Sequence, residues 1–467
     1  MRKRKTGLRL TAFFLAAAVL WMLPSSVSHA VSASGAIAQG VDVSMHNGAI
    51  DWSKVAGAGM KFTFIKVGST KSGIDPNFAA NITNAQAAGL KTGVYLYSYA
   101  TTPQAAADEA NLVLQWIDGY TVNYPVVFDI EDKCHKNLSE QQLIDIINAF
   151  CTTIDAAGYY PMVYSNKNMF VNKLSICGWD KWVAQYNDSC EYNNNVCFWQ
   201  YSSHGSVNGF GSRVDVNYQY KDYSQLIIPE GFIEHNGNVR FYRNWRMQKG
   251  FVDYNNTRYY LDGAGNLVRG WFSDQTGTYY LSPQDGSIAR GQCVVDGADY
   301  YFTAEGIKMT GWVVLGDQRY YYEPSNNGIM KREWFSDAEG HFYFFDRTDG
   351  HMLTGDQVID GARYLFGADG IRVTGMTERE DGTYYYDTAT GQLMYGFITL
   401  SDKTYYADEA GHIVTGVYTI DNQPYYFDAS GVLIKNQQVV LDGISYYTTP
   451  DGIFMPAEEP VQEEGAA

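Results

Sequence analysis

The chain has 467 residues, of which 45% are hydrophobic and 18% are charged, and its formal net charge is −17. This length exceeds that of one ordinary domain, and the apolar content excludes a disordered chain. Residues 31–228 carry 12 basic and 17 acidic side chains, whereas residues 229–467 carry 17 and 34. A polyanion such as nucleic acid would be repelled by the second segment, so nucleic acid is excluded as a partner.

Residues 1–30 predict an export signal. Five basic side chains precede an apolar run from Leu10 to Leu23, and Ser28 and Ala30 are small residues at the expected cleavage positions. The alternative is a retained membrane anchor, but a run of 14 residues is short for a bilayer span. We therefore expect a secreted, extracellular protein that meets a membrane only during export.

Six cysteines do not make a disulfide scaffold in a chain of this length. Cys190 and Cys197 could close a hairpin loop, while metal ligation is disfavoured because no Cys-x-x-Cys pair or histidine partner accompanies them. The sequence leaves the pairing open.

After a short linker at 31–39, residues 40–228 alternate short strand patterns with helical ones, which predicts an α/β domain. The expected strands are 41–44, 62–67, 93–99, 125–131, 161–165, 181–186, 197–202 and 213–220. The expected helices are 76–88, 103–117, 139–157 and 167–174, and the third opens on a capping box from Ser139 to Gln142. Five βα units followed by three strands predict an irregular TIM-like (β/α)5β3 barrel.

A linker at 229–238 precedes a different pattern over 239–455, and residues 456–467 read as a polar tail. Tyrosines that open aromatic-rich strands recur about every 21 residues, at 259, 279, 300, 320, 343, 364, 384, 405, 425 and 446. Each unit contains a glycine turn between short strands, which predicts a β-hairpin too small to bury a core alone. We therefore expect an all-β solenoid of stacked hairpins.

Four carboxylates lie where the barrel interpretation places strand ends. Asp129 and Glu131 alternate with apolar residues and so point to the same side of their strand, and Asp42 and Asp215 lie on the first and last strands. Crowded carboxylates have their pKa values driven apart, which suits the acid and the charged partner of glycosidic bond cleavage. The alternative is a solvated strand exit or a salt-bridge partner.

Aromatic and amide side chains accompany these acids. Tyr95, Tyr97 and Tyr99 share one face of the third strand, and stacking rings with hydrogen-bonding groups suit a sugar. The further candidates for substrate binding are Tyr164, Trp182, Gln185 and Gln200. The alternative for each aromatic residue is a place in the barrel core.

Five ordered segments resemble glycoside hydrolase family 25, the lysozymes of the Chalaropsis and phage endolysin type. They are Asp42–Trp52, Phe128–Glu131, Trp182–Tyr186, Phe198–Ser202 and Val214–Asn217. The resemblance implies cleavage of the β-1,4 bond between N-acetylmuramic acid and N-acetylglucosamine in peptidoglycan, without metal or cofactor. It implies that Glu131 is the general acid/base, that Asp129 supports the reacting centre, and that Asp42 and Asp215 shape the charge of the site.

The hairpin repeats resemble the choline-binding and glucan-binding cell-wall modules. The signature Gly-Trp occurs at Trp271 and Trp312, and Trp334 occupies the same position, but later repeats carry Phe397 or Val417. A choline cage depends on tryptophans, so the ligand stays open between choline and another carbohydrate ligand of a cell-wall polymer. The candidate ligand-binding residues are Trp271, Trp312, Trp334, Tyr279, Tyr300 and Tyr320.

Two alternatives to a wall-anchored hydrolase follow from the same sequence. A non-catalytic adhesin with a decayed barrel has no reason to keep four acids in an aromatic cleft. An amidase would need zinc ligands or a Cys-His pair, and the eight histidines show no such spacing.

Overall fold

The computed structural model describes residues 31–235 and 237–457 and divides the chain into two compact units, residues 1–268 and 269–467. The predicted export signal and most of the predicted polar tail lie outside the described residues. Within the described residues, no helix is long and apolar enough to cross a membrane.

The first unit contains a closed eight-stranded barrel, which confirms the predicted fold. Its strands are β2 (Ala38–Val43), β3 (Phe62–Ser69), β5 (Lys91–Tyr97), β6 (Val126–Asp129), β7 (Pro161–Asn166), β8 (Lys181–Ala184), β10 (Val196–Gly205) and β11 (Val214–Gln219). The first seven run parallel in the order β2-β3-β5-β6-β7-β8-β10. Strand β11 closes the barrel by pairing antiparallel with both β10 and β2. Short strands β1 (Val31–Ser32), β4 (Gly73–Ile74) and β9 (Ser189–Cys190) lie outside this ring.

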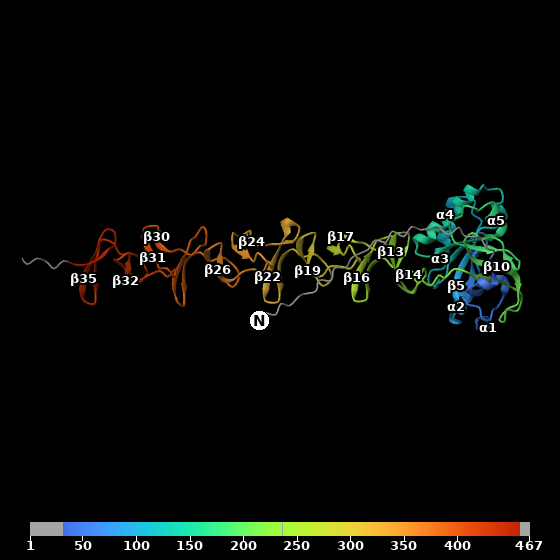
Figure 1. Ribbon diagram of the computed structural model, residues 1–467, viewed down its shortest axis with the longest axis horizontal. Helices are drawn as coiled ribbons and strands as arrows, with labels where there is room; N and C mark the ends of the chain where they lie inside the picture. The colour runs from blue at the N-terminus through green and yellow to red at the C-terminus, as the bar shows by residue number, and fades with distance from the viewer. Residues whose placement is uncertain (1–30, 236, 458–467) are drawn as a thin grey trace, which may run out of the picture. The chain divides into compact units, whose positions relative to one another are not determined.

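Five helices follow the first five barrel strands (Figure 1). They are α1 (Trp52–Gly57), α2 (Phe78–Ala87), α3 (Pro103–Trp116), α4 (Glu140–Ala156) and α5 (Lys167–Asn172). The capping box predicted at α4 forms, since the Ser139 hydroxyl accepts from the backbone of Gln142 and the Gln142 side chain accepts from the backbone of Ser139. Helix α1 was not expected from the sequence; it has only six residues, and the Asp51 side chain caps it.

Aromatic side chains fill the inside of the barrel. The rings of Phe64 and Trp182 stack with centroids 4.5 Å apart, and Phe198 packs 5.0 Å from both Phe62 and Phe64. A separate apolar layer, which includes Phe128, Phe150 and Trp199, lies between the strands and the helices. Because the interior is packed, polar side chains gather at the two ends of the barrel.

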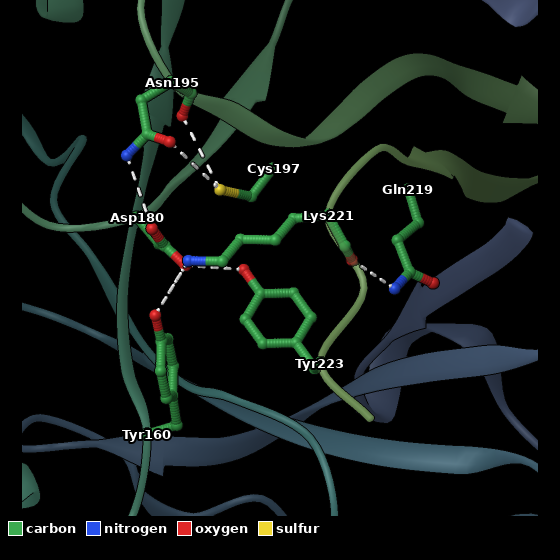
Figure 2. Close-up of polar contacts among 7 residues, drawn as sticks. All are labelled: Tyr160, Asp180, Asn195, Cys197, Gln219, Lys221 and Tyr223. Carbon is green, nitrogen blue, oxygen red and sulfur yellow. Dashed lines mark hydrogen bonds and ion pairs between the residues drawn. The ribbon is translucent and has the colours of Figure 1, made fainter. Parts of the chain in front are cut away.

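One end of the barrel is held by a buried carboxylate (Figure 2). Asp180 precedes β8 and accepts from the Lys221 ammonium at 2.6 Å and from the hydroxyls of Tyr160 and Tyr223 at 2.9 Å each. Burial alone would raise the pKa of Asp180, but the Lys221 ammonium and these hydrogen bonds outweigh it and lower the pKa. This network links β8 to the segment that follows β11.

The replacement Asp180→Asn should lower the free energy of unfolding by about 2–3 kcal/mol at pH 7, because Lys221 loses its charged partner. A lowered pKa stabilises the fold above the pKa of the unfolded carboxyl, so the difference from wild type should shrink as the pH falls below about 4. Urea unfolding followed by tryptophan fluorescence measures both effects. Equal stability of variant and wild type at pH 7 would contradict this role.

Three further strand pairings complete the first unit. Strands β12 (Glu230–His235), β13 (Asn238–Arg243) and β14 (Arg246–Met247) form one sheet, and β15 (Gly250–Tyr254) pairs with β16 (Thr257–Leu261). Strand β12 lies in the segment that was expected to be a linker. Arg240 donates to the backbone oxygen of Asp155 at 2.9 Å, and His235 Nε2 lies 2.8 Å from the Asp155 carboxylate. These contacts attach the first sheet to α4 of the barrel.

The second unit is a succession of antiparallel hairpins, as predicted (Figure 1). Their strands are β17 (Gly270–Ser273), β18 (Thr278–Leu281), β19 (Gly291–Val295), β20 (Ala298–Phe302), β21 (Gly311–Leu315), β22 (Gln318–Glu323), β23 (Ile329–Met330), β24 (Glu333–Ser336), β25 (Phe342–Phe345), β26 (Gly355–Ile359), β27 (Ala362–Phe366), β28 (Gly375–Arg379), β29 (Gly382–Tyr386), β30 (Gly396–Leu400), β31 (Lys403–Ala407), β32 (Gly416–Ile420), β33 (Gln423–Phe427), β34 (Gln438–Leu441), β35 (Ile444–Thr448) and β36 (Phe454–Pro456). Asp296-Gly297 and Asp360-Gly361 turn two of them with positive φ at both residues, as tight hairpin turns require.

All six cysteines lie among the described residues, and each has a free thiol. The hairpin closure considered for Cys190 and Cys197 is therefore not formed in this structure.

Candidate active site

The four predicted carboxylates meet at the end of the barrel opposite Asp180. Asp42 lies near the end of β2, Asp129 is the last residue of β6, and Glu131 follows two residues later. Asp215 lies at the start of β11, but because β11 runs antiparallel, its start is at the same edge as the end of β2. The pairing of Asp42 with Asp215 across these two strands confirms that distant parts of the chain converge here.

Asp42 and Asp215 form an acidic pair. Asp42 is 5% exposed, and its Oδ1 accepts from Asn217 at 2.7 Å and from Gln200 at 2.9 Å. Burial, followed by the charge of Asp215, raises the pKa of Asp42 well above its usual value, and burial also raises the pKa of Asp215. The two carboxyls therefore share one proton at a pH at which two separate carboxyls would both be ionised.

Asp129 is buried, and its Oδ1 has no hydrogen-bond partner in the structure. Burial, followed by the charge of Glu131, raises the pKa of Asp129 well above its usual value, while Lys66 opposes the rise. A buried carboxylate oxygen without a donor is costly for the free protein, and it is available to a donor that arrives with a ligand.

Glu131 lies beside Asp129 but is exposed to solvent. Loss of hydration at the barrel mouth, followed by the charges of Asp215 and Asp132, raises the pKa of Glu131, and Lys66 again opposes the rise. The arrangement therefore presents an accessible carboxyl with an increased tendency to keep its proton next to a more deeply buried one.

The three tyrosines expected on one face are all half-buried along this mouth. Tyr95 packs edge-on against Trp182 with centroids 6.1 Å apart, and the rings of Tyr97 and Tyr99 are 5.2 Å apart. Tyr97 also donates to Asp132 at 3.2 Å. Partly exposed rings next to carboxylates are suited to contact a sugar.

The other predicted substrate-binding residues differ in their positions. The hydroxyl of the buried Tyr164 donates to Gln200 at 2.9 Å, so both groups support Asp42. Trp182 is 1% exposed and donates to Asn217, which places it below the site as part of the barrel interior. The Gln185 side chain accepts from the backbone of Glu191, at the beginning of a neighbouring loop.

Two charged or polar groups of the site were not predicted. Lys66 follows Phe62 and Phe64 on the inward face of β3, and Asn217 follows Asp215 on the inward face of β11. The alternation of inward and outward side chains along a strand, which indicated Asp129 and Glu131, also places Lys66 and Asn217 on the inward face.

The predicted tryptophans of the hairpin repeats form aromatic clusters. Trp271 lies 5.0 Å from Tyr280 and 5.1 Å from Tyr300, and Trp312 and Trp334 have equivalent neighbours. Tyr279 and Tyr320, the first tyrosines of their pairs, are buried. In each of the three clusters, the second aromatic residue of a pair contacts the tryptophan of its own hairpin, and the first aromatic residue of the next pair contacts it from the following hairpin.

Comparison with known proteins agrees with this geometry. The model of Glycosyl hydrolases family 25 matches residues 41–210. The protein YegX of Escherichia coli O157:H7 is 31% identical over 189 residues, which are 38% of this chain and 68% of that protein. The chain belongs to glycosyl hydrolases family 25. This confirms the predicted family and the predicted class of enzyme, a glycoside hydrolase.

Further relatives and family models match other lengths of the chain. Lysozyme M1 of Streptomyces globisporus is 31% identical over 198 residues, 38% of this chain and 66% of that protein. Glucosyltransferase-S of Streptococcus mutans is 28% identical over 186 residues, 38% of this chain, but the chain spans only 13% of that enzyme's length. A choline-binding repeat matches residues 289–334, 353–396 and 414–452, and a putative cell wall binding repeat matches residues 249–267.

The replacement Asp129→Asn should raise the free energy of unfolding by about 1–2 kcal/mol at pH 8. A folded-state pKa above the unfolded value means that ionisation opposes folding, so this gain should shrink as the pH falls towards 4. Urea unfolding at several pH values measures it. The exposed Asp108→Asn is the matched control and should change little; a destabilised Asp129→Asn variant at pH 8 would refute the argument.

Proposed function

We propose that the chain is a secreted muramidase, which hydrolyses the β-1,4 bond between N-acetylmuramic acid and N-acetylglucosamine in peptidoglycan while its repeats hold it on the cell wall. The observation that carries this proposal is the exposed Glu131, with its raised pKa, beside the buried Asp129 at the open end of a family 25 barrel. Lysozyme M1, which is 31% identical over 198 residues, supports the choice of substrate.

Glu131 acts as the general acid in this mechanism. Its raised pKa retains the proton that the leaving glycosidic oxygen needs, and its exposure lets the carboxyl reach a polymer that cannot enter the packed barrel. After the bond breaks, the ionised Glu131 takes a proton from the incoming water.

Asp129 supports the reacting sugar from below. Its unpartnered Oδ1 accepts the N–H of the substrate's own N-acetyl group and orients that group towards the anomeric carbon. The ionised form of Asp129 also stabilises an oxocarbenium-like transition state. Asp42 and Asp215 share a proton nearby and so keep the total charge of the site low.

The repeats serve as a wall anchor. Many weak contacts to one insoluble polymer raise the local concentration of substrate for a linked catalytic domain. The matches to choline-binding and cell wall binding repeats support this role, and the partner is a cell-wall polymer that carries choline or another carbohydrate ligand. The protein is therefore extracellular or associated with the cell wall.

The replacement Glu131→Gln should reduce the release of reducing sugar from purified peptidoglycan by roughly 10²–10⁴-fold, because the general acid is lost. The exposed Glu234→Gln is the matched control. Mass analysis of the wild-type digest should show new reducing ends at N-acetylmuramic acid. Ends at N-acetylglucosamine would overturn the proposed bond, and full activity of Glu131→Gln would overturn the mechanism.

The replacement Lys66→Met should move the whole pH profile of hydrolysis to higher pH. Lys66 lowers the pKa of both Glu131 and Asp129, so without it Glu131 keeps its proton to a higher pH and Asp129 ionises later. The exposed Lys61→Met, one residue before the start of β3, is the control. The measurement is kcat/KM between pH 4 and 9, and an unshifted profile would contradict this role of Lys66.

A further inference from the structure

A pocket of about 410 Å³, which we call the α2 pocket, lies in the first unit outside the acidic site. This volume is within the roughly 300–1,000 Å³ of typical ligand sites. One wall is the loop of residues 48–50 with Trp52 at the start of α1, and the other is a row of three asparagines, Asn77, Asn81 and Asn84. None of the described residues that line the pocket is charged.

The α2 pocket lies at the same end of the barrel as the four carboxylates. Strands β2 and β3 run parallel, with Val43 opposite Ile65. One wall of the pocket follows the carboxyl end of β2, and the other follows the carboxyl end of β3 by way of β4. Because parallel strands of a barrel end at the same edge, both walls lie at the end where Asp42 and Glu131 are found. This is the end at which a polymeric substrate meets the barrel.

Hydrogen bonds hold both walls in place. The Asp75 carboxylate accepts from the backbone N–H of Met45 at 2.9 Å and from that of Asn77 at 2.9 Å, so it joins the turn before the loop to the start of α2. At the other end of the loop, the N–H of Asp51 donates to the backbone oxygen of Gly209 at 3.0 Å. A ligand therefore meets a preformed site and orders little of the chain when it binds.

Asn81 is the residue that points to a ligand. It is only 5% exposed although it lines the pocket, and its Nδ2 has no hydrogen-bond partner among the described residues. A buried N–H group without an acceptor lowers the stability of the free protein, and an acceptor that arrives with a ligand removes this cost. Asn77 and Asn84 lie one helical turn to either side on the same face, and the Asn77 side chain makes no capping hydrogen bond with α2.

The lining favours a neutral ligand that carries an acetamido group. Each asparagine amide offers two N–H donors and a carbonyl acceptor, which match the acetamido and hydroxyl groups of N-acetylglucosamine. Ile50, Ala80 and the buried Trp52 supply apolar surface for the methyl group and the ring carbons. The peptides of peptidoglycan carry charged ends instead, and burying these in an uncharged pocket would be unfavourable.

We propose that the α2 pocket binds an N-acetylglucosamine unit of the glycan strand at a position outside the bond that Glu131 cleaves. The inference rests on the proposed muramidase function and adds a second saccharide site to the barrel. Asn81 Nδ2 donates to the carbonyl oxygen of the acetamido group, and the amides of Asn77 and Asn84 contact hydroxyl groups of the sugar. A strand held here remains attached to the barrel when the acidic site exchanges its substrate.

The first test is the hydrolysis of long glycan strands freed of their peptides. Asn81→Leu should raise KM roughly 3–10-fold with kcat unchanged, because it removes a hydrogen bond that lies away from the reacting atoms. The same replacement should not lower the free energy of unfolding, since it also removes the unpartnered amide. Ala80→Gln fills the pocket from an exposed position and should raise KM equally, which keeps the test valid if Asn81→Leu does not fold. Ala79→Gln, exposed on the same helix but outside the lining, is the matched control.

An unchanged KM in both Asn81→Leu and Ala80→Gln would overturn the inference. A KM that rises only for strands that retain their peptides would also overturn it, because the pocket would then be a peptide site.

Calorimetry separates this inference from the proposed function. The probe is the β-1,4-linked trimer of N-acetylglucosamine, and the protein is the full chain with Glu131→Gln, in which binding is measured without cleavage. Adding Ala80→Gln should remove one binding event that Ala79→Gln leaves intact. If this event is lost as expected but the wild type hydrolyses no peptidoglycan, the muramidase function is overturned and the saccharide site stands. If no event is lost while the wild type is active, the saccharide site is overturned and the muramidase function stands.

Discussion

The closure of the barrel by an antiparallel strand is the constraint on which the acidic site depends. Seven parallel strands alone would leave β2 and β10 without partners on one side, and β11 fills this gap in the opposite direction. Its beginning therefore meets the end of β2, which brings Asp215 to Asp42 from more than 170 residues away along the chain. Once that pair shares a proton, the charge beside Glu131 and Asp129 is low enough for four carboxylates to occupy one mouth.

The features that depend on local alternation could be predicted from the sequence. Side chains of a strand alternate between its two faces, so the positions of Asp129, Glu131 and the three tyrosines at the end of β5 and just after it followed from the pattern alone. The capping box at Ser139 and the number of βα units were likewise readable, because both depend on neighbours within a few residues. At these elements, the conformation that the local sequence prefers is the one that the whole fold requires.

The features that depend on distant neighbours were not predictable. Lys66 acts on the site only because β3 and β6 lie on either side of β5 in the barrel. Trp182 is buried because Phe64 and Tyr164 cover its ring. Helix α1 is stabilised by its cap and by packing, since six residues make a marginal helix alone. The aromatic clusters of the repeats likewise combine successive hairpins, so the sequence revealed the tryptophans but not which rings of the following hairpin contact them.

The sheet of β12–β14 determines where the chain can be separated into parts that stay stable. Asp155 on α4 holds Arg240 and His235, and Gly158 leaves room for the Met247 side chain that a larger residue would displace. A recombination event that replaced the repeats from residue 229 onwards would uncover this face of α4, whereas an exchange after residue 268 would leave it covered. The barrel and the sheets of β12–β16 therefore form one exchangeable module, which is longer than the segment that the family model matches. Natural or engineered chimeras should stay stable when they carry these sheets together with the barrel.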